Sequence, residues 1–281
     1  FRFAVPDALA ESLHRLDGAK IGLAGDQDPR DREPWVTAGL IQEAVASAKL
    51  AGAGTSWDDA KAMLLTGRHP RDQDERAIAN VHLALLSVRI PEAVPLTPSR
   101  VQELHARLLV GMAGGPATGA AATRLAALCA FANGEEPDGF IHPVVRAVLV
   151  HAWVLCDRPF ADGNGRLARL LFQASLLSQG YRIFECLALS RELLRAPERY
   201  AGALRRVASG GNDLTYFLVH QIEAIDASVQ ELTDNLRRRT DEFRDVEVRL
   251  RGTAGLNHRQ QALLVHALGH PGARYIIEGH R

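Results

Sequence analysis

One segment of the sequence combines residue types that bind phosphate with a spacing that suits a tight turn. Residues 159–169 read PFADGNGRLAR and lie between two apolar stretches that are expected to be helices. Gly163 and Gly165 let the backbone turn and approach a ligand without a Cβ clash. The helix expected to begin near Arg166 offers free N–H groups and the positive end of its dipole. Together these features predict an anion site suited to a diphosphate.

Four polar side chains of this segment supply further chemistry. Arg166 and Arg169 lie three residues apart, so both project from one helix face, and each presents a fork that matches phosphate oxygens. Asp162 is a hard oxygen ligand beside that anion, where Mg²⁺ would bind. Asn164 can orient the backbone or a phosphate with its amide. The alternative is a glycine-rich turn with two surface arginines, but eleven ordered positions between apolar helices favour the phosphate site.

The segment closely resembles the signature of the Fic family, His-Pro-Phe-x-Asp/Glu-Gly-Asn-Gly-Arg-x-x-Arg, and the resemblance covers roughly residues 35–280. It implies a helical Fic fold and an ancestry among transferases that usually move AMP from ATP onto a protein hydroxyl. It also implies a role for each residue of the turn: magnesium for Asp162, the outer phosphate or an ion pair with an inhibitory glutamate for Arg169, and the other phosphates for Gly163, Asn164, Gly165 and Arg166.

Three departures from the family pattern bear on activity. Arg158 stands where the family has the histidine that acts as general base, and a guanidinium cannot accept a proton at ordinary pH. General-base catalysis contributes about 10²–10⁴-fold to a rate. Ala51 stands where the family's inhibitory helix has its glutamate, although Ser47–Gly52 keeps the frame of that element. Residues 111–122 are rich in Gly and Ala, so the β-hairpin flap that docks target peptides by strand pairing is expected to be shortened or lost.

Other residues could replace the missing base, but a structural role is favoured for each of them. They are Asp157, Cys156, His151, Glu185 and His142. His142 in particular is expected to cap a helix or to pack near the preceding loop.

Composition limits the class of protein. The chain has 281 residues with a hydrophobic fraction of 47%, which is ordinary for one or two globular domains. Lys+Arg and Asp+Glu both number 33, so net charge gives no general attraction to nucleic acid or membrane. No run of about 18 apolar residues and no signal peptide pattern is visible. The three scattered cysteines fit a reducing compartment, so we expect a cytoplasmic protein without a membrane partner.

Apolar periodicity predicts an all-α fold: a Fic-type helical core, an N-terminal helical arm, and a truncated C-terminal segment that resembles a helix-turn-helix. The expected helices cover 37–49, 57–65, 74–88, 98–109, 125–132, 143–157, 166–179, 190–208 and 213–240. Thr97 and Ser56 are expected caps.

Four domains are expected from these elements. They are an arm at 1–34 with one short helix and an extended piece, inhibitory-type helices at 35–75, the Fic core at 76–245, and a linker with a partial winged helix at 246–281. The recognition helix of a winged helix would lie beyond Arg281, so DNA binding is not expected for this chain.

The leading hypothesis is a degenerate Fic protein that binds a magnesium–nucleotide, such as ATP, or another phosphate-containing ligand but lacks classical AMP transfer to a protein target. A second hypothesis is a repurposed enzyme that acts on a small molecule or phosphorylated metabolite, with Arg158 stabilising an anion. A third is a non-catalytic partner or regulatory protein that binds an active homologue or a DNA regulator. Apart from the nucleotide or phosphorylated small molecule, the candidate partners are a protein target and a second copy of the chain in a homo-oligomer.

Overall fold

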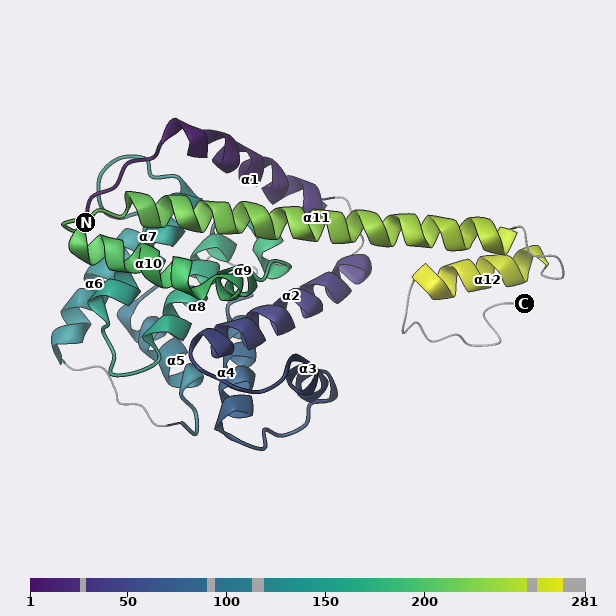
Figure 1. The fold of residues 1–281 in the computed structure, drawn as a ribbon, viewed down its shortest axis with the longest axis horizontal. Coiled ribbons are helices and arrows are strands. Elements are labelled where there is room, and N and C mark those ends of the chain that lie inside the picture. The colour runs from purple at the N-terminus through teal and green to yellow at the C-terminus, as the bar shows by residue number, and fades with distance from the viewer. Residues whose placement is uncertain (26–28, 90–93, 113–118, 252–256, 270–281) are drawn as a thin grey trace. The chain divides into compact units, whose positions relative to one another are not determined.

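The computed structural model describes residues 1–25, 29–89, 94–112, 119–251 and 257–269, and every regular element within them is a helix. The α-helices, labelled in Figure 1, are α1 (Asp7–Gly25), α2 (Pro29–Leu50), α3 (Trp57–Thr66), α4 (Gln73–Ser87), α5 (Pro98–Leu108), α6 (Gly119–Asn133), α7 (Pro143–Asp157), α8 (Asn164–Ser178), α9 (Leu189–Arg195), α10 (Pro197–Ser209), α11 (Thr215–Arg251) and α12 (His258–Gly269). A 3₁₀ helix, η1 (Arg182–Glu185), lies between α8 and α9. The expected all-α class is confirmed. None of the described helices has both the length and the apolar character that crossing a bilayer requires.

The chain divides into two compact units, residues 1–228 and 229–281. The first unit contains α1 to α10 and the start of α11. The domain limits expected at 34, 75 and 245 stay predictions.

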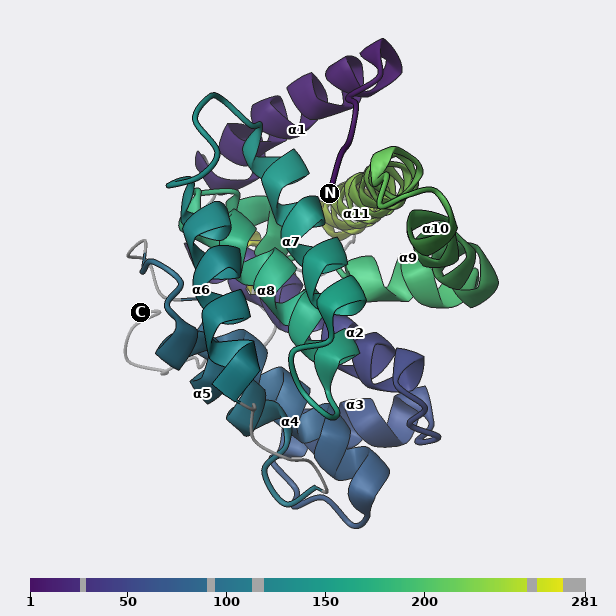
Figure 2. The same ribbon diagram turned by 90° about the vertical axis from the view of Figure 1, so that its left-hand side faces the viewer.

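Helices α7 and α8 pack against each other at the centre of the first unit (Figure 2). Nine of the fifteen residues of α7 are buried, which agrees with its nearly continuous apolar sequence. The expected cap is confirmed at the start of α7, where the Val144 N–H donates to His142 Nδ1 over 3.2 Å and Pro143 occupies the first helical position. The two helices therefore hold the intervening turn, residues 158–163, on a rigid support.

The N-terminal region is more helical than the sequence predicts. A short helix and an extended piece were expected within 1–34, but α1 has 19 residues and α2 begins at Pro29. Glycines and prolines in this region suggested breaks, and burial overrides that weak preference. The buried leucines of α1 are spaced four and three residues apart, at Leu9, Leu13 and Leu16. Pro34 lies inside α2, where it removes one backbone donor without ending the helix.

Local signals predicted several other boundaries well. Ser56 and Thr97 cap α3 and α5 as expected, each accepting a backbone N–H three residues on.

Two helices near the end of the first unit differ from the expected ranges. The helix expected over 190–208 is two helices, since α9 ends at Arg195 and α10 begins at Pro197. The helix expected over 213–240 continues to Arg251.

The glycine-rich connection at 111–122 is only partly described. Helix α6 already begins at Gly119, and the predicted loss of a flap falls mainly on residues 113–118, outside the described residues.

The second unit contains the end of α11 and all of α12. Helix α12 begins with a reciprocal cap, in which the Gln260 N–H donates to Asn257 Oδ1 and the Asn257 N–H donates to Gln260 Oε1, both over 2.9 Å. Helix α12 thus lies within the segment 246–281, where a linker and a partial winged helix were expected. Residues 270–281 of that segment lie outside the described residues.

Candidate functional site

The turn between α7 and α8 is closed by one amide side chain. Asn164 Oδ1 accepts the Phe160 N–H over 3.1 Å, and Asn164 Nδ2 donates to the Phe160 carbonyl over 2.6 Å. Both halves of the amide are therefore used on the backbone. Asn164 was expected to orient either the backbone or a phosphate, and in the structure it orients the backbone.

The two glycines bring backbone N–H groups to an open surface. Gly163 has φ of 77°, in the left-handed region, and caps α8 without a side-chain hydrogen bond. A Cβ on Gly165 would lie 3.4 Å from Arg169 Nη1, so the glycine leaves this guanidinium edge uncovered. The Leu167 N–H donates to the Gly163 carbonyl, whereas the three N–H groups of residues 164–166 make no hydrogen bond within the described part of the chain. Such a helix start attracts an anion.

Arg166 is buried but poorly paired. Its side chain is 4% exposed, and its Nη2 lies 3.4 Å from Asp162 Oδ2. Its Nη1 makes only long contacts, 3.3 Å to Met112 Sδ and 3.4 Å to the Leu108 carbonyl, and its Nε is buried without a partner. Burial lowers the pKa of this guanidinium, and the nearby Asp162 carboxylate opposes that effect. A buried cation with unused donors favours an incoming anion.

Arg169 is held by α2. Its Nε donates to Ser47 Oγ and its Nη2 donates to the Ser47 carbonyl, both over 2.8 Å. Ala51, which was expected to stand in place of an inhibitory glutamate, lies four residues farther along the chain and is exposed. Arg169 is thus held by neutral oxygens of Ser47. Ser47 belongs to the segment 47–52 that the sequence analysis singled out. Nothing in the sequence indicated its contact with Arg169.

Asp162 projects from the turn with its side chain 58% exposed. Its backbone carbonyl accepts a hydrogen bond of 2.8 Å from His105 Nε2, so this nitrogen carries the proton. Burial is the main cause that lowers the pKa of His105, which favours the neutral ring. That ring stacks on Phe160 with centroids 3.6 Å apart. His105 therefore fixes the turn from α5, and no local pattern in the sequence indicated this role.

These residues border one cleft of about 470 Å³. Its lining includes every site residue predicted from the sequence and residues at the end of α2. The full lining is Ala48, Leu50, Ala51, Gly52, Ala53, Asp74, Ala77, Met112, Leu155, Arg158, Asp162, Gly163, Asn164, Gly165, Arg166, Arg169 and Leu204. The structure thus brings the predicted residues together, and their individual roles stay predictions.

The donor set of the cleft suits a magnesium ion that is shared with phosphate. Asp162 and Asp74 are its two carboxylates, and Asp74 Oδ2 also accepts the Gly54 N–H over 2.8 Å. Among the residues with described positions, no three His, Cys, Asp or Glu side chains are grouped as a metal cage. Mg²⁺ is commonly held by one or two carboxylates plus substrate phosphates, so the residues fit that arrangement.

Arg158 adds an exposed cation to the same cleft. Its φ of 46° ends α7, and its N–H donates to the Val154 carbonyl over 3.0 Å. Its side chain forms no ion pair within the described residues. The position therefore faces the predicted phosphate site without a proton-accepting group.

The other candidate bases have structural partners away from the cleft. His151 is fully buried, its Nε2 lies 2.8 Å from the Tyr200 hydroxyl, and burial lowers its pKa to about 3. Glu185 is fully buried and pairs with Arg32 over 2.9 Å and with Arg182 over 3.0 Å.

The other three candidate bases, Asp157, His142 and Cys156, lie outside the cleft. Asp157 pairs with Arg124 over 2.8 Å, and His142 caps α7. Cys156 is exposed as a residue, and partial burial of its thiol raises the pKa of that group.

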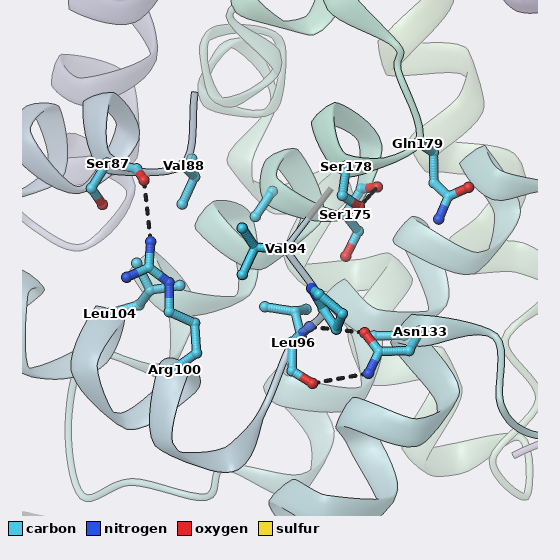
Figure 3. Close-up of a pocket in the computed structure, with 13 residues that line it drawn as sticks. Ser87, Val88, Val94, Leu96, Arg100, Leu104, Asn133, Ser175, Ser178 and Gln179 are labelled. Atoms are coloured by element: carbon cyan, nitrogen blue, oxygen red, sulfur yellow. Dashed lines mark hydrogen bonds between the residues drawn. The ribbon is translucent and has the colours of Figure 1, made fainter. Parts of the chain in front are cut away.

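A separate hollow of about 230 Å³ lies at the other end of α8 (Figure 3). Arg100 Nη2 there donates to the Ser87 carbonyl over 3.2 Å, and the Asn133 amide makes two hydrogen bonds with the backbone of Leu96 (Figure 3). These polar groups hold loop backbone, so this hollow offers less ligand chemistry than the cleft.

Comparison with known proteins adds a family match. Residues 95–176 match the model of the Fic/DOC family. A segment of 65 residues is 40% identical to the protein adenylyltransferase and cysteine protease IbpA of Histophilus somni (strain 2336). That segment covers 23% of this chain and 2% of the curated relative.

Solved structures share the fold over most of the chain. A Fic family protein from Desulfovibrio desulfuricans G20 has a TM-score of 0.68 at 19% identity, with 94% of this chain and 85% of that chain covered. Fic-1 (aa134–508) from C. elegans has a TM-score of 0.66 at 19% identity, with coverages of 82% and 73%. A Fic domain containing signaling protein from Bacteroides thetaiotaomicron VPI-5482 has a TM-score of 0.61 at 22% identity, with coverages of 78% and 91%.

Proposed function

We propose that this chain, whose residues 95–176 form a Fic/DOC-family domain, binds the phosphates of a nucleotide together with Mg²⁺ in the cleft at the start of α8 and lacks the general base for AMP transfer to a protein. The observation that supports this most is the buried Arg166 guanidinium, whose Nε has no partner beside three free backbone N–H groups. The cleft volume of about 470 Å³ lies within the range of small-molecule sites.

The residues of the turn would divide the work. The N–H groups at the start of α8 and the Arg166 guanidinium would bind phosphate oxygens. Asp162 would hold Mg²⁺, which neutralises phosphate charge when bound. Arg169 would reach the outer phosphate through Nη1, which faces Gly165 while Nε and Nη2 stay on Ser47. ATP is the first ligand to test because it combines these groups.

Calorimetric titration with Mg–ATP tests the binding half of the proposal. Arg166→Gln should weaken binding by about tenfold or more, because a hydrogen bond to a charged group is lost. Arg107→Gln is the matched control: Arg107 is a half-exposed arginine that pairs with Glu103, outside the cleft. Gly165→Ala is a second variant that places a methyl group at the phosphate approach without removing a buried charge. A folded wild-type protein that takes up no Mg–ATP would overturn the proposal.

Restoring a base at position 158 tests the catalytic half. Arg158→His should produce self-modification with labelled ATP at a rate about 10²–10⁴ times that of the wild type, because a general base contributes that factor. Arg158→Ala is the control, since it removes the guanidinium without adding a base. Equal labelling of the wild-type protein and the histidine variant would show that the base is not what is missing.

A second candidate function is supported by the position of Arg158. An exposed cation without an ion pair borders the same cleft, which suits an enzyme that stabilises an anionic small molecule or phosphorylated metabolite. Under this alternative, Arg158→Ala weakens the binding of small phosphate esters. Under the leading proposal, Arg166 makes the larger contribution.

We place the protein in the cytoplasm. Its three cysteines, Cys129, Cys156 and Cys186, are all free, which supports a reducing compartment.

A further inference from the structure

A groove of about 1050 Å³ runs along α7. It shares no lining residue with the cleft at the start of α8. Leu149, Trp153, Cys156 and Asp157 of α7 line the groove, whereas Leu155 of the same helix and Arg158, which follows it, line the cleft. The other groove residues come from the N-terminal segment, α6, the loop before α7 and the loop before α11: Phe1, Phe3, Ala127, Phe131, Glu135, Glu136, Pro137, Asp138, Ile141, Asn212 and Leu214.

Aromatic rings form one wall of the groove. The Trp153 ring meets the Phe1 ring edge-on with centroids 5.8 Å apart, and its centroid lies 5.7 Å from that of Phe131. Trp153 is only partly buried. The faces of such rings attract cations, Trp most strongly. The Arg146 guanidinium already lies 5.0 Å from the centroid of the Phe131 ring, so this wall accommodates a cation.

The lining of the groove is acidic. It contains four carboxylates, at Glu135, Glu136, Asp138 and Asp157, and no Lys, Arg or His. Asp157 is paired with Arg124. The other three carboxylates are exposed and have no ion-pair partner among the described residues. Glu135 Oε1 accepts a hydrogen bond of 3.1 Å from Asn133 Nδ2, which leaves its charge without a counter-charge. Exposed carboxylates without ion pairs beside aromatic faces attract guanidinium and ammonium groups.

We propose that this groove binds a basic peptide segment of a partner protein, with an Arg or Lys side chain lying between Trp153 and the carboxylates of residues 135–138. Charge complementarity selects the peptide. The volume slightly exceeds the usual upper range of small-molecule pockets, which favours an extended segment with several side chains. The binding needs no nucleotide, so it stands independently of the function proposed for the cleft.

The experiment measures the fluorescence anisotropy of a labelled short peptide of alternating Arg and Leu, added to the full chain without nucleotide. Binding should weaken as salt rises, because the contacts are charged and exposed. Glu136→Gln combined with Asp138→Asn should weaken binding by about three- to tenfold. Trp153→Ala should weaken it by about tenfold or more. The double variant alters only exposed side chains, so it tests the groove even if Trp153→Ala fails to fold.

The control variant is Asp58→Asn combined with Glu198→Gln, which neutralises two exposed carboxylates outside the groove and should leave binding unchanged. Peptides with Gln or Glu in place of Arg should bind at least about tenfold more weakly. Equal binding of the three peptides, or an unchanged dissociation constant for the double variant, would overturn the proposal. So would self-association of the peptide-free protein that the groove variants abolish, because a second copy would then be the occupant.

Discussion

Arg166 and Arg169 carry the same charge on the same face of α8, yet they have different partners. Arg169 places two of its nitrogens on Ser47 over 2.8 Å, whereas Arg166 makes only contacts of 3.3 Å or longer and leaves Nε unpaired. A phosphate near Arg166 would therefore add hydrogen bonds, and one near Arg169 would have to use Nη1 or replace Ser47. This difference is why the binding test rests on Arg166.

His151 gives a pH prediction at the scale of one side chain. Its pKa is lowered to about 3 by burial, with Arg169 and His220 adding to the shift, while an unfolded histidine titrates near 6.5. Between these values the unfolded state binds the extra proton, so stability falls as pH decreases. From pH 7 to pH 5 this residue should cost about 2 kcal/mol of unfolding free energy. Urea denaturation at both pH values measures the change.

The variant His151→Phe isolates this contribution, because other partly buried histidines also titrate in the wild-type protein. The pH dependence of the variant should be flatter than that of the wild type by the same amount, even if its stability at pH 7 is lower. His69→Gln, at an exposed position, is the control substitution. Parallel curves for wild type and His151→Phe would contradict the assignment.

The residues of the turn could be predicted from the sequence because their contacts are local. Asn164 reaches Phe160 four residues away, and Gly163 and Gly165 act through their own backbone. The supports of the turn could not be predicted in this way. His105 lies 57 residues from Asp162, and Ser47 lies 122 residues from Arg169. Only the packing of α5 and α2 against α8 brings them together.

At the scale of elements, the end of α2 forms one side of the cleft at the start of α8. Helix α2 approaches the backbone before α9 so closely that a Cβ on Gly39 would lie 2.5 Å from the Cys186 carbonyl oxygen. Near the C-terminal end of α2, Ser47 holds Arg169. Ala51, which follows the helix, borders the cleft with its small side chain. The end of α2 therefore brings no carboxylate to this side of the cleft.

Ala51→Glu tests what a carboxylate at this position would do. The new charge would face the same cleft as the two arginines of α8, so it should compete with phosphate and weaken Mg–ATP binding by about tenfold. Ala51→Gln, with nearly the same shape and no charge, is the matched control and should change the dissociation constant far less. Titration of both variants measures the difference. An equal loss in both would indicate a steric effect and contradict the electrostatic explanation.

Helix boundaries were predictable where a side chain caps its own helix. Ser56, Thr97 and His142 each accept a backbone N–H two or three residues away, so the signal lies within a few letters of sequence. The lengths of the N-terminal helices were underestimated because the contacts that stabilise them are distant in sequence. The buried leucines of α1 and residues such as Leu40 of α2 are stabilised by distant packing, which outweighs local glycines and Pro34.

At the scale of the whole molecule, one central helix serves two surfaces. Helix α7 ends in Arg158 at the cleft and carries Trp153 along the acidic groove. A protein bound in the groove would therefore lie against the helix that leads into the turn at 158–163. The all-α class was predictable from the spacing of apolar residues, and the Fic fold from the resemblance of the turn to a family signature. The groove was not predictable, because its wall combines residues from both ends of the first unit.

The division into two units predicts that the core survives removal of the C-terminal segment. Among the described residues, Leu232 is the one buried side chain after Ser228. A chain of residues 1–239 keeps Leu232 and should retain the stability of the first unit within about 1 kcal/mol, which corresponds to a shift in Tm of roughly 2–4 °C. Thermal unfolding followed by circular dichroism measures Tm. Leu218→Ala in the full chain is the control for damage to the first unit, since Leu218 is fully buried and its loss should cost about 2–5 kcal/mol. A shortened chain that unfolds as readily as this variant would show that residues 240–281 stabilise the first unit.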